Sequence, residues 1–420
     1  MNKRQWLLIP MLAVIILLLW VWNRFSMNTK PQENTEESQS EDTLTILAPY
    51  QLRLQQQILD EVAEEYSSSG IGSKKARFVY IPNDNYLKEI SLRLDQGDNT
   101  DLIICSNTMM PALIKMGVFQ DISGKLTEEK IDSFTYPEMW ETAKTDNRYY
   151  GIPFTVDPVM LFYNKDRMND LSLSIPETWD ELADTAEKMQ FLGTYGFGFA
   201  ADNAEEASAF FAEMLYSKGG DFRHVNSYNG IKSFEFIQKL ERRNTIAPET
   251  INWSKEDLAR AFADGEVEMM ANSLSAINIL RYQTIHYHIG ITPLPAENKA
   301  SGMLYGDNIG VTVGADPEAE TFLKYLYNEN TVERIAYAMD TIPVLGNVDY
   351  RVKRIRPDDG EDIVRYFKAN GFVMENFSSW QEISEEIQTG INDTIKNDNS
   401  DLQMIADSTG SKIHTAILEQ

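Results

Sequence analysis

The sequence has few of the residues on which cross-links and common metal sites depend. Its 420 residues include one cysteine, Cys105, so an internal disulfide is excluded. Because Cys105 ends the apolar run 102–105, the pattern of a buried strand, we expect a small core residue rather than a reactive thiol. His286 and His288 would share one face of a strand, but no third type of ligand lies near them. We therefore predict no metal site and no cofactor.

Basic residues are also scarce, with 38 Lys and Arg against 64 Asp and Glu, which gives a formal net charge of -26. Nucleic-acid binding rests on clustered Lys and Arg, so we predict no nucleic-acid partner. A strong negative charge is typical of a soluble, monomeric protein. The apolar fraction of 43% and the charged fraction of 24% are ordinary globular values, and the length allows two domains, each with its own core.

Recognisable catalytic motifs are absent. The sequence has no glycine-rich phosphate loop and no Gly-x-Ser-x-Gly nucleophile elbow. The paired carboxylates of glycoside hydrolases depend on a three-dimensional spacing, and nothing marks such a pair among so many acidic residues. We therefore predict that the protein is not an enzyme, and we keep an acidic cell-surface glycoside hydrolase as an alternative.

The longest apolar run lies at the N-terminus. Lys3 and Arg4 precede the run 6–22, which is long enough to span the hydrocarbon core of a bilayer. A cleaved signal peptide would be followed by small residues and a lipoprotein signal by a cysteine, and neither follows here. We predict an uncleaved signal anchor, a transmembrane helix over 1–27, with cleavage as the alternative. The acidic stretch 28–42 has no apolar side chain to bury and reads as a disordered tether.

Strand and helix patterns alternate after the tether. The alternation implies a parallel sheet with helices on its faces, and ligands of such sheets lie beyond the carboxyl ends of the strands. The loops 49–51 and 106–108 are therefore candidate parts of a site. The strands are expected over 44–48, 77–81 and 102–105, and the helices over 54–66 and 87–94.

The stretch 149–166 contains two extended apolar runs separated by a short polar step. Pro153 and Pro158 disfavour a helix, because each lacks a backbone N–H and pushes the preceding residue towards extended geometry. A second α/β-patterned region follows, in which Thr178 and Ser254 have the spacing of helix N-caps. An extended segment between two such regions is what a hinge-crossing strand requires.

The order of these motifs resembles the family 1 extracellular solute-binding proteins of the maltodextrin-binding type. The resemblance covers about residues 44–418. It implies an α/β, two-lobed, periplasmic-binding-protein-like fold of type II, in which three strands cross the hinge. The N-lobe would comprise 43–156 plus 308–355, and the C-lobe 157–304 plus 356–420. The motifs that carry the resemblance are 101–104, 117–122, 150–166, 176–179, 261–270, 289–295 and 342–344, with a helix from Trp380.

The resemblance also implies a set of ligand-binding residues. Asp157 matches the family's polar hinge residue, and Trp380 resembles the aromatic residue that stacks on sugar. The sequence departs from the family at 273–275, where Ser-Leu-Ser replaces a frequent Gly-Trp pair. The predicted ligand-binding residues are Tyr50, Gln51, Asn107, Thr108, Asp157, Asn203, Tyr305, Asp307 and Trp380.

By resemblance, the protein would bind a small solute, a mono- or oligosaccharide, and deliver it to the transmembrane subunits of an ABC permease. Closure of the lobes around the ligand would be a population shift from open to closed. The folded part would lie outside the cell membrane of a Gram-positive-type bacterium, held by the single N-terminal helix. The alternative from another class is a ligand-sensing co-receptor for a membrane sensor kinase.

Overall fold

The computed structural model describes residues 42–82, 86–297, 302–348, 357–396 and 401–419. The chain from Leu44 to Gln420 forms one compact unit. The predicted anchor, and all of the predicted tether except Asp42, lie outside the described residues. Within the described part, none of the helices has the length and apolar character needed to cross a membrane.

The first of the two main sheets has five strands in the order β2-β1-β3-β11-β6. Strands β1 and β3 are parallel, with Ile46 opposite Leu102, and β11 runs antiparallel to both β3 and β6. The parallel pairing of β1 with β3 confirms the α/β character that the alternating strand and helix patterns after the tether predict. The strands are β1 (Thr43–Ala48), β2 (Lys75–Tyr80), β3 (Leu102–Ser106), β6 (Gly151–Pro153) and β11 (Asp307–Val311).

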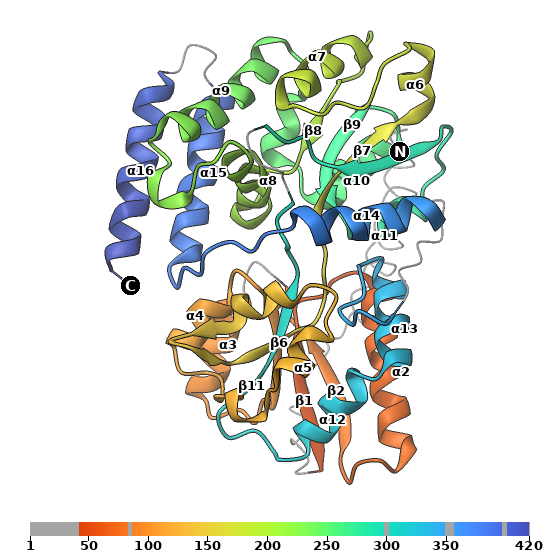
Figure 1. Cartoon of the computed structure of the whole chain (residues 1–420), viewed down its shortest axis with the longest axis vertical. Helices are drawn as coiled ribbons and strands as arrows, with labels where there is room; N and C mark the ends of the chain where they lie inside the picture. Colours follow the sequence, from red (N-terminus) through yellow and green to blue (C-terminus); the bar gives the residue numbers. More distant parts are fainter. Residues whose placement is uncertain (1–41, 83–85, 298–301, 349–356, 397–400, 420) are drawn as a thin grey trace, which may run out of the picture. The chain divides into compact units, whose positions relative to one another are not determined.

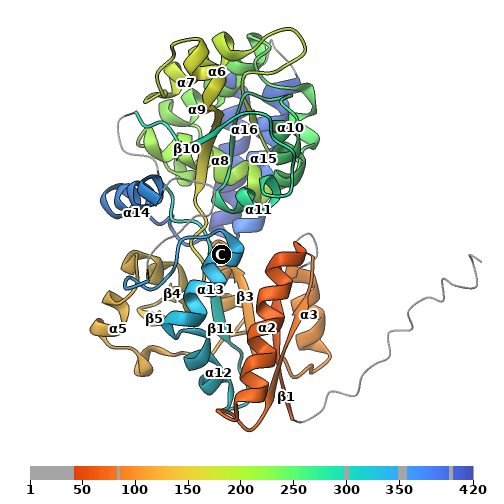
Figure 2. The same cartoon turned by 90° about the vertical axis from the view of Figure 1, so that its right-hand side faces the viewer.

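The helices around this sheet complete what we call the N-lobe. Helices α2 and α13 pack together, as Figures 1 and 2 show. The only cysteine, Cys105, is fully buried in β3 against the sulfur of Met110, which confirms its prediction as a core residue. The helices are α2 (Arg53–Ser69), α3 (Tyr86–Asp95), α4 (Met110–Lys115), α5 (Glu128–Asp132), α12 (Ala319–Leu326) and α13 (Glu329–Met339), with 3-10 turns at Ser123–Lys125 and Pro137–Ala143 and a hairpin of β4 (Lys144–Thr145) and β5 (Arg148–Tyr149).

The second sheet has four strands in the order β10-β7-β9-β8. Strand β7 is antiparallel to both neighbours, so that Phe162 lies opposite Met270 on one side and Ile291 on the other. Its residues are buried from Val159 to Tyr163, as expected for a strand covered on both faces. The strands are β7 (Val159–Asn164), β8 (Gly198–Phe199), β9 (Met269–Ser273) and β10 (Ile289–Pro293).

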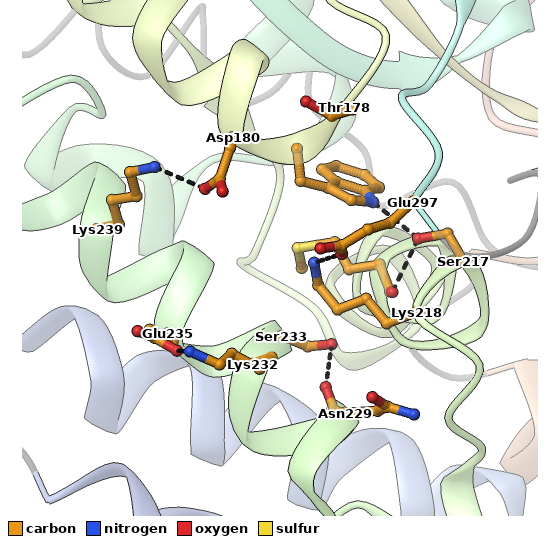
Figure 3. A network of polar contacts seen from close by, with 12 residues as sticks. Thr178, Asp180, Ser217, Lys218, Asn229, Lys232, Ser233, Glu235, Lys239 and Glu297 are labelled. Atoms are coloured by element: carbon orange, nitrogen blue, oxygen red, sulfur yellow. Dashed lines mark hydrogen bonds and ion pairs between the residues drawn. The ribbon is translucent and has the colours of Figure 1, made fainter.

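We call this sheet and its helices the C-lobe. Helix α8 packs against α15, and α15 against α16 (Figure 1). Ion pairs also join elements, since Lys239 of α9 contacts Asp180 of α7 at 2.7 Å and Lys218 contacts Glu297 (Figure 3). The helices are α6 (Lys165–Asp170), α7 (Trp179–Met189), α8 (Ala204–Ser217), α9 (Tyr228–Arg242), α10 (Lys255–Ala263), α11 (Ile277–Leu280), α14 (Pro357–Asn370), α15 (Trp380–Lys396) and α16 (Leu402–Leu418), with 3-10 turns at Phe222–His224, Pro248–Asn252 and Leu274–Ala276.

The predicted helix caps are present. Ser254 and Asp257 form a reciprocal capping box at the start of α10. Thr178 accepts a hydrogen bond from the backbone N–H of Glu181 at the start of α7, while the Glu181 carboxylate accepts from the N–H of Glu177 instead of returning to the cap residue.

Two described segments carry the chain between the lobes. Segment 154–158 joins β6 to β7, and segment 302–306 leads back into β11. They run side by side, because the N–H of Asp157 donates to the carbonyl of Tyr305 at 2.8 Å. Gly306 permits the close approach: a Cβ there would lie 2.1 Å from the carbonyl oxygen of Thr155. The predicted extended runs on either side of the polar step are thus confirmed as β6 and β7. The predicted lobe boundaries remain a prediction.

Candidate functional site

The carboxyl edge of the first sheet brings Tyr50, Thr155 and Asp307 together. Tyr50 follows β1, and its hydroxyl donates to Asp307 Oδ2 at 2.6 Å. The Thr155 hydroxyl donates to the same oxygen at 2.9 Å. Burial raises the pKa of Asp307, and these two hydrogen bonds oppose the rise. Burial and the negative charge of Asp307 together raise the pKa of Tyr50 well above its ordinary value, so the phenol stays a donor.

Asp157 lies in the outgoing crossover segment and faces the C-lobe. Its two carboxylate oxygens accept from the backbone N–H of Ser275 at 2.8 Å and from the Ser275 hydroxyl at 2.6 Å. Burial raises the pKa of Asp157, the bonds from Ser275 lower it, and the charge of Asp307 adds to the rise. The two carboxylates therefore lie close enough to repel each other.

Glu205 is a hydrogen-bond acceptor for three separate segments of the chain. Its Oε1 accepts from the hydroxyls of Thr108 and Tyr305, each at 2.5 Å, and its Oε2 accepts from Trp380 Nε1 at 2.6 Å. Thr108 follows β3 in the N-lobe, Tyr305 lies in the returning crossover segment, and Trp380 opens α15. A single C-lobe carboxylate thus joins both lobes and the crossover. Asn203, the N-cap of α8, places Glu205 in the first helical turn, where the helix dipole favours a negative charge.

Helix α8 also contacts the returning crossover segment two turns further along. Glu213 is fully buried, and its carboxylate accepts from the backbone N–H groups of Gly302 and Met303 at 2.8 and 2.9 Å. Burial raises its pKa to about 7, although the two N–H donors oppose the shift. Together Glu205 and Glu213 fix the position of the crossover against α8.

Lys255 is the cation that interacts with the carboxylates of the site. It begins α10 directly after the N-cap Ser254, and its backbone N–H donates to Glu206 Oε2 at 2.9 Å. Burial acts to lower the pKa of Lys255, but the charges of nearby carboxylates outweigh burial and raise it. The carboxylates that raise it are those of Glu206, Glu256, Asp157 and Asp307.

The lobes also meet at an ion pair. Arg281, which follows α11, contacts both carboxylate oxygens of Asp340, which follows α13, with Nη2 at 2.5 Å from Oδ1. The side chains are 16% and 2% exposed, so the pair is largely shielded from water. A shielded pair of this kind contributes to stability only while both partners are present.

A small pocket lies between the N-lobe loop after β3 and the segment that precedes α15. Its walls include Asn107 and Thr108, two of the predicted ligand-binding residues. The remaining lining residues are Pro111, Thr142, Met303, Leu304, Met374, Glu375, Asn376 and Phe377. In the described ranges, no three His, Cys, Asp or Glu side chains are grouped as metal ligands. The exposed His288 is hydrogen-bonded through Nδ1 to Asp166 at 3.0 Å.

The model of the family described as bacterial extracellular solute-binding protein matches residues 54–332, about two thirds of the chain. The chain belongs to the bacterial extracellular solute-binding protein family.

Curated relatives of this solute-binding protein are distant. It is 26% identical over 290 residues to the multiple sugar-binding protein of Streptococcus mutans, covering 64% of this chain and 66% of the relative. It is 22% identical over 259 residues to a binding protein of Brucella abortus, covering 59% of this chain and 62% of the relative. In both cases the chain matches less than two thirds of the relative's length.

Solved structures show the fold. Maltose-bound MalE3 of T. maritima superimposes with a TM-score of 0.78 at 18% identity, covering 89% of this chain and 99% of that one. A solute-binding protein of Thermotoga lettingae bound to alpha-D-tagatose superimposes with a TM-score of 0.76 at 19% identity. The superposition covers 90% of this chain and 100% of that one. The two-lobed, periplasmic-binding-protein-like α/β fold predicted from the sequence is thus confirmed.

The structure places the nine predicted site residues of this solute-binding protein in different ways. Tyr50 with Asp307, and Thr108 with Tyr305 and Trp380, are brought together as described above. Asp157 is hydrogen-bonded to Ser275. Asn107 is buried, and Asn203 caps α8. Gln51 is exposed beside Tyr50 and forms no hydrogen bond with the site in the described part of the chain. All nine remain predictions as ligand-binding residues.

The Trp380 ring differs from what its predicted stacking role requires. It is 3% exposed, and its ring packs edge-on against Phe222 with the centroids 5.2 Å apart. Stacking on a sugar therefore requires the site to open further around the ring. Tyr50, the other aromatic side chain at the sheet edge, is 8% exposed.

Sequence reasoning missed Glu205, Lys255, Thr155 and Ser275. A usable signal existed for Glu205, because Asn203 followed by acidic residues is a helix start, which places the first turn of α8 beside the predicted Asn203. Ser275 lies in the Ser-Leu-Ser stretch that the sequence comparison treats as a departure from the family. In the structure that departure supplies the two donors to Asp157.

Proposed function

We propose that this protein binds an extracellular solute, a mono- or oligosaccharide, and delivers it to the transmembrane subunits of an ABC importer. The observation that carries the proposal is the convergence on Glu205 of donors from the N-lobe, the crossover and the C-lobe. Polar groups gathered from both lobes between the two sheets are what a hinged solute-binding site needs. The family, together with the sugar-binding relative and neighbours, supports carbohydrate as the class of solute.

Closure of the lobes would follow from contacts of one ligand with both. The Thr108–Glu205 hydrogen bond and the Arg281–Asp340 ion pair join the lobes. A ligand that contacts Asp157 and Asp307 as well would add to the stability of that arrangement. The binding set that we propose is the predicted one of nine residues with Glu205, Lys255 and Ser275 added. The proposed lobes are 43–156 plus 308–355 and 157–304 plus 356–420.

Anchoring is part of the proposal. A transmembrane helix over 1–27 and a tether over 28–42 would hold the protein at the outer face of the cell membrane as a monomer, next to its permease. The basis is the apolar run 6–22 in the sequence. Fractionation of cells tests it: recovery of the intact chain from the soluble extracellular fraction would refute the anchor.

Thermal unfolding in the presence of a sugar library tests the function. A ligand that binds only the folded state raises the unfolding midpoint with the logarithm of its excess over Kd. We expect one sugar to raise the unfolding midpoint by roughly several degrees. Asp157→Ala should abolish this rise, because that change removes the hinge carboxylate. If no sugar shifts the midpoint while another class of solute does, carbohydrate binding is refuted and the fold assignment stands.

A further inference from the structure

The three carboxylates of the site are stabilised by neutral donors. Asp157 accepts hydrogen bonds from Ser275, and Asp307 accepts them from Tyr50 and Thr155. Glu205 accepts hydrogen bonds from Thr108, Tyr305 and Trp380. Within the described part of the chain, none of these three carboxylates forms an ion pair. Hydrogen bonds from neutral groups hold the oxygens in place but leave the negative charge uncompensated.

The nearby lysine does not restore the balance. Lys255 interacts electrostatically with Asp157 and Asp307, and it interacts with Glu206 as well. Burial raises the pKa of Glu206 to about 7. One positive charge therefore faces several acidic groups, and the repulsion between Asp157 and Asp307 remains. A second positive charge in the site would be favourable.

The side-chain donors that surround Glu205 are already used. The single N–H of Trp380 and the hydroxyl hydrogens of Thr108 and Tyr305 all point to Glu205. These hydroxyl groups can offer a ligand only their oxygen lone pairs. Around Glu205 the site therefore presents acceptors, and this part of it suits a ligand that brings donors. A phosphate or carboxylate group placed beside Glu205 would meet both like charge and further acceptors.

An independent acceptor lies beside this group. Asn107 is 6% exposed, its Nδ2 donates to the carbonyl of Leu304 at 2.8 Å, and its backbone N–H donates to the carbonyl of Gly306. Its Oδ1 is buried without a hydrogen-bond partner in the described residues. Asn107 and Thr108 line the same pocket. A buried carbonyl oxygen without a donor is unfavourable, so this position also favours a donor from a ligand.

We propose that the part of the solute held in this site carries a protonated amine among its hydroxyl groups, as an amino sugar does. The inference rests on the proposed function and narrows its class of solute. An ammonium group brings positive charge and three donors, which matches the carboxylates without ion pairs and the unpaired, buried acceptor of Asn107.

Matched sugars test the inference on the full chain, purified in a detergent without a sugar head group. Each set shares one skeleton: glucosamine, glucose and glucuronic acid; galactosamine, galactose and galacturonic acid; chitosan disaccharide and cellobiose. Thermal shifts select the skeleton, and titration calorimetry gives Kd. We expect the amine to bind about tenfold tighter than its neutral partner at low salt, with the advantage shrinking at about 0.5 M salt.

Substitutions of the carboxylates test which of them cause the preference for the amine over the neutral sugar. Asp157→Asn and Asp307→Asn should each reduce the amine-to-neutral ratio severalfold, roughly, because each removes a charge and keeps the shape. Asp95→Asn is the matched control, since Asp95 is exposed at the end of α3, and it should keep the ratio. If an Asn variant does not fold, the ratio measured on the unaltered chain decides alone.

The outcomes separate the two proposals. A neutral or acidic sugar that binds as tightly as its amine partner would overturn this inference and leave carbohydrate binding in place. Failure of every sugar to shift the midpoint, in neutral, cationic and anionic form, would overturn carbohydrate binding and this inference with it.

Discussion

The buried carboxylate of Glu213 should make stability fall as pH rises. Its pKa is raised from 4.5 to about 7 by burial in α8. The folded chain therefore holds this proton more tightly than the unfolded chain. The contribution of Glu213 to stability is fully present below pH 4.5 and is lost as pH rises through about 7. The size of the pKa shift corresponds to about 3 kcal/mol between these limits.

The Glu213→Gln variant removes this titration while keeping the side-chain shape and one acceptor for Gly302 or Met303. We expect the free energy of unfolding of the unaltered chain to drop by about 3 kcal/mol more than that of the variant between roughly pH 4.5 and pH 8. Urea unfolding at several pH values measures both. Other titrating groups are common to the two proteins, so they cancel in the difference.

Glu64→Gln is the matched control, because Glu64 is exposed on α2. It should show the same pH dependence as the unaltered chain. Parallel pH profiles for Glu213→Gln and the unaltered chain would refute the reasoning, since they would mean that burial does not raise the pKa of this carboxylate. A variant less stable at every pH, but with the changed slope, would still support it.

Three further substitutions test contacts between the lobes and at the crossover. Glu205→Ala leaves three donors without their acceptor, so urea unfolding should show a loss of about 2 kcal/mol; an unchanged midpoint would show that the three bonds are not formed in solution. Arg281→Met leaves Asp340 charged and shielded, and we expect a loss of about 3 kcal/mol by the same assay, which a neutral result would contradict. Gly306→Ala places a Cβ against the Thr155 carbonyl and should lower the thermal midpoint by several degrees, roughly; a fully stable alanine variant would disprove the close approach.

The fold could be predicted because its signals are local. The prolines at 153 and 158 and the apolar runs beside them are sufficient to indicate two extended segments, and the Ser254–Asp257 spacing indicates a helix start. These patterns depend on a few neighbouring residues. Their order along the chain is also what identifies the family.

The site was predicted only in part, because its contacts join distant residues. The loops that contain Tyr50 and Thr108 could be expected at the edge of the sheet, where strand ends meet. The role of Glu205 depends on three partners, of which Trp380 is 175 residues away. No spacing in the sequence predicts that convergence. The burial of the Trp380 ring likewise depends on packing between helices that the sequence pattern does not specify.

The complete burial of Cys105 has a practical consequence. It is the only cysteine in the chain, and burial raises the pKa of its thiol well above the ordinary value, so maleimide reagents should leave it unmodified in the folded protein. A cysteine introduced on the surface of each lobe would then be labelled selectively without removing a native residue. The chain is thus already suited to fluorescence measurements of the distance between its lobes as solute is added.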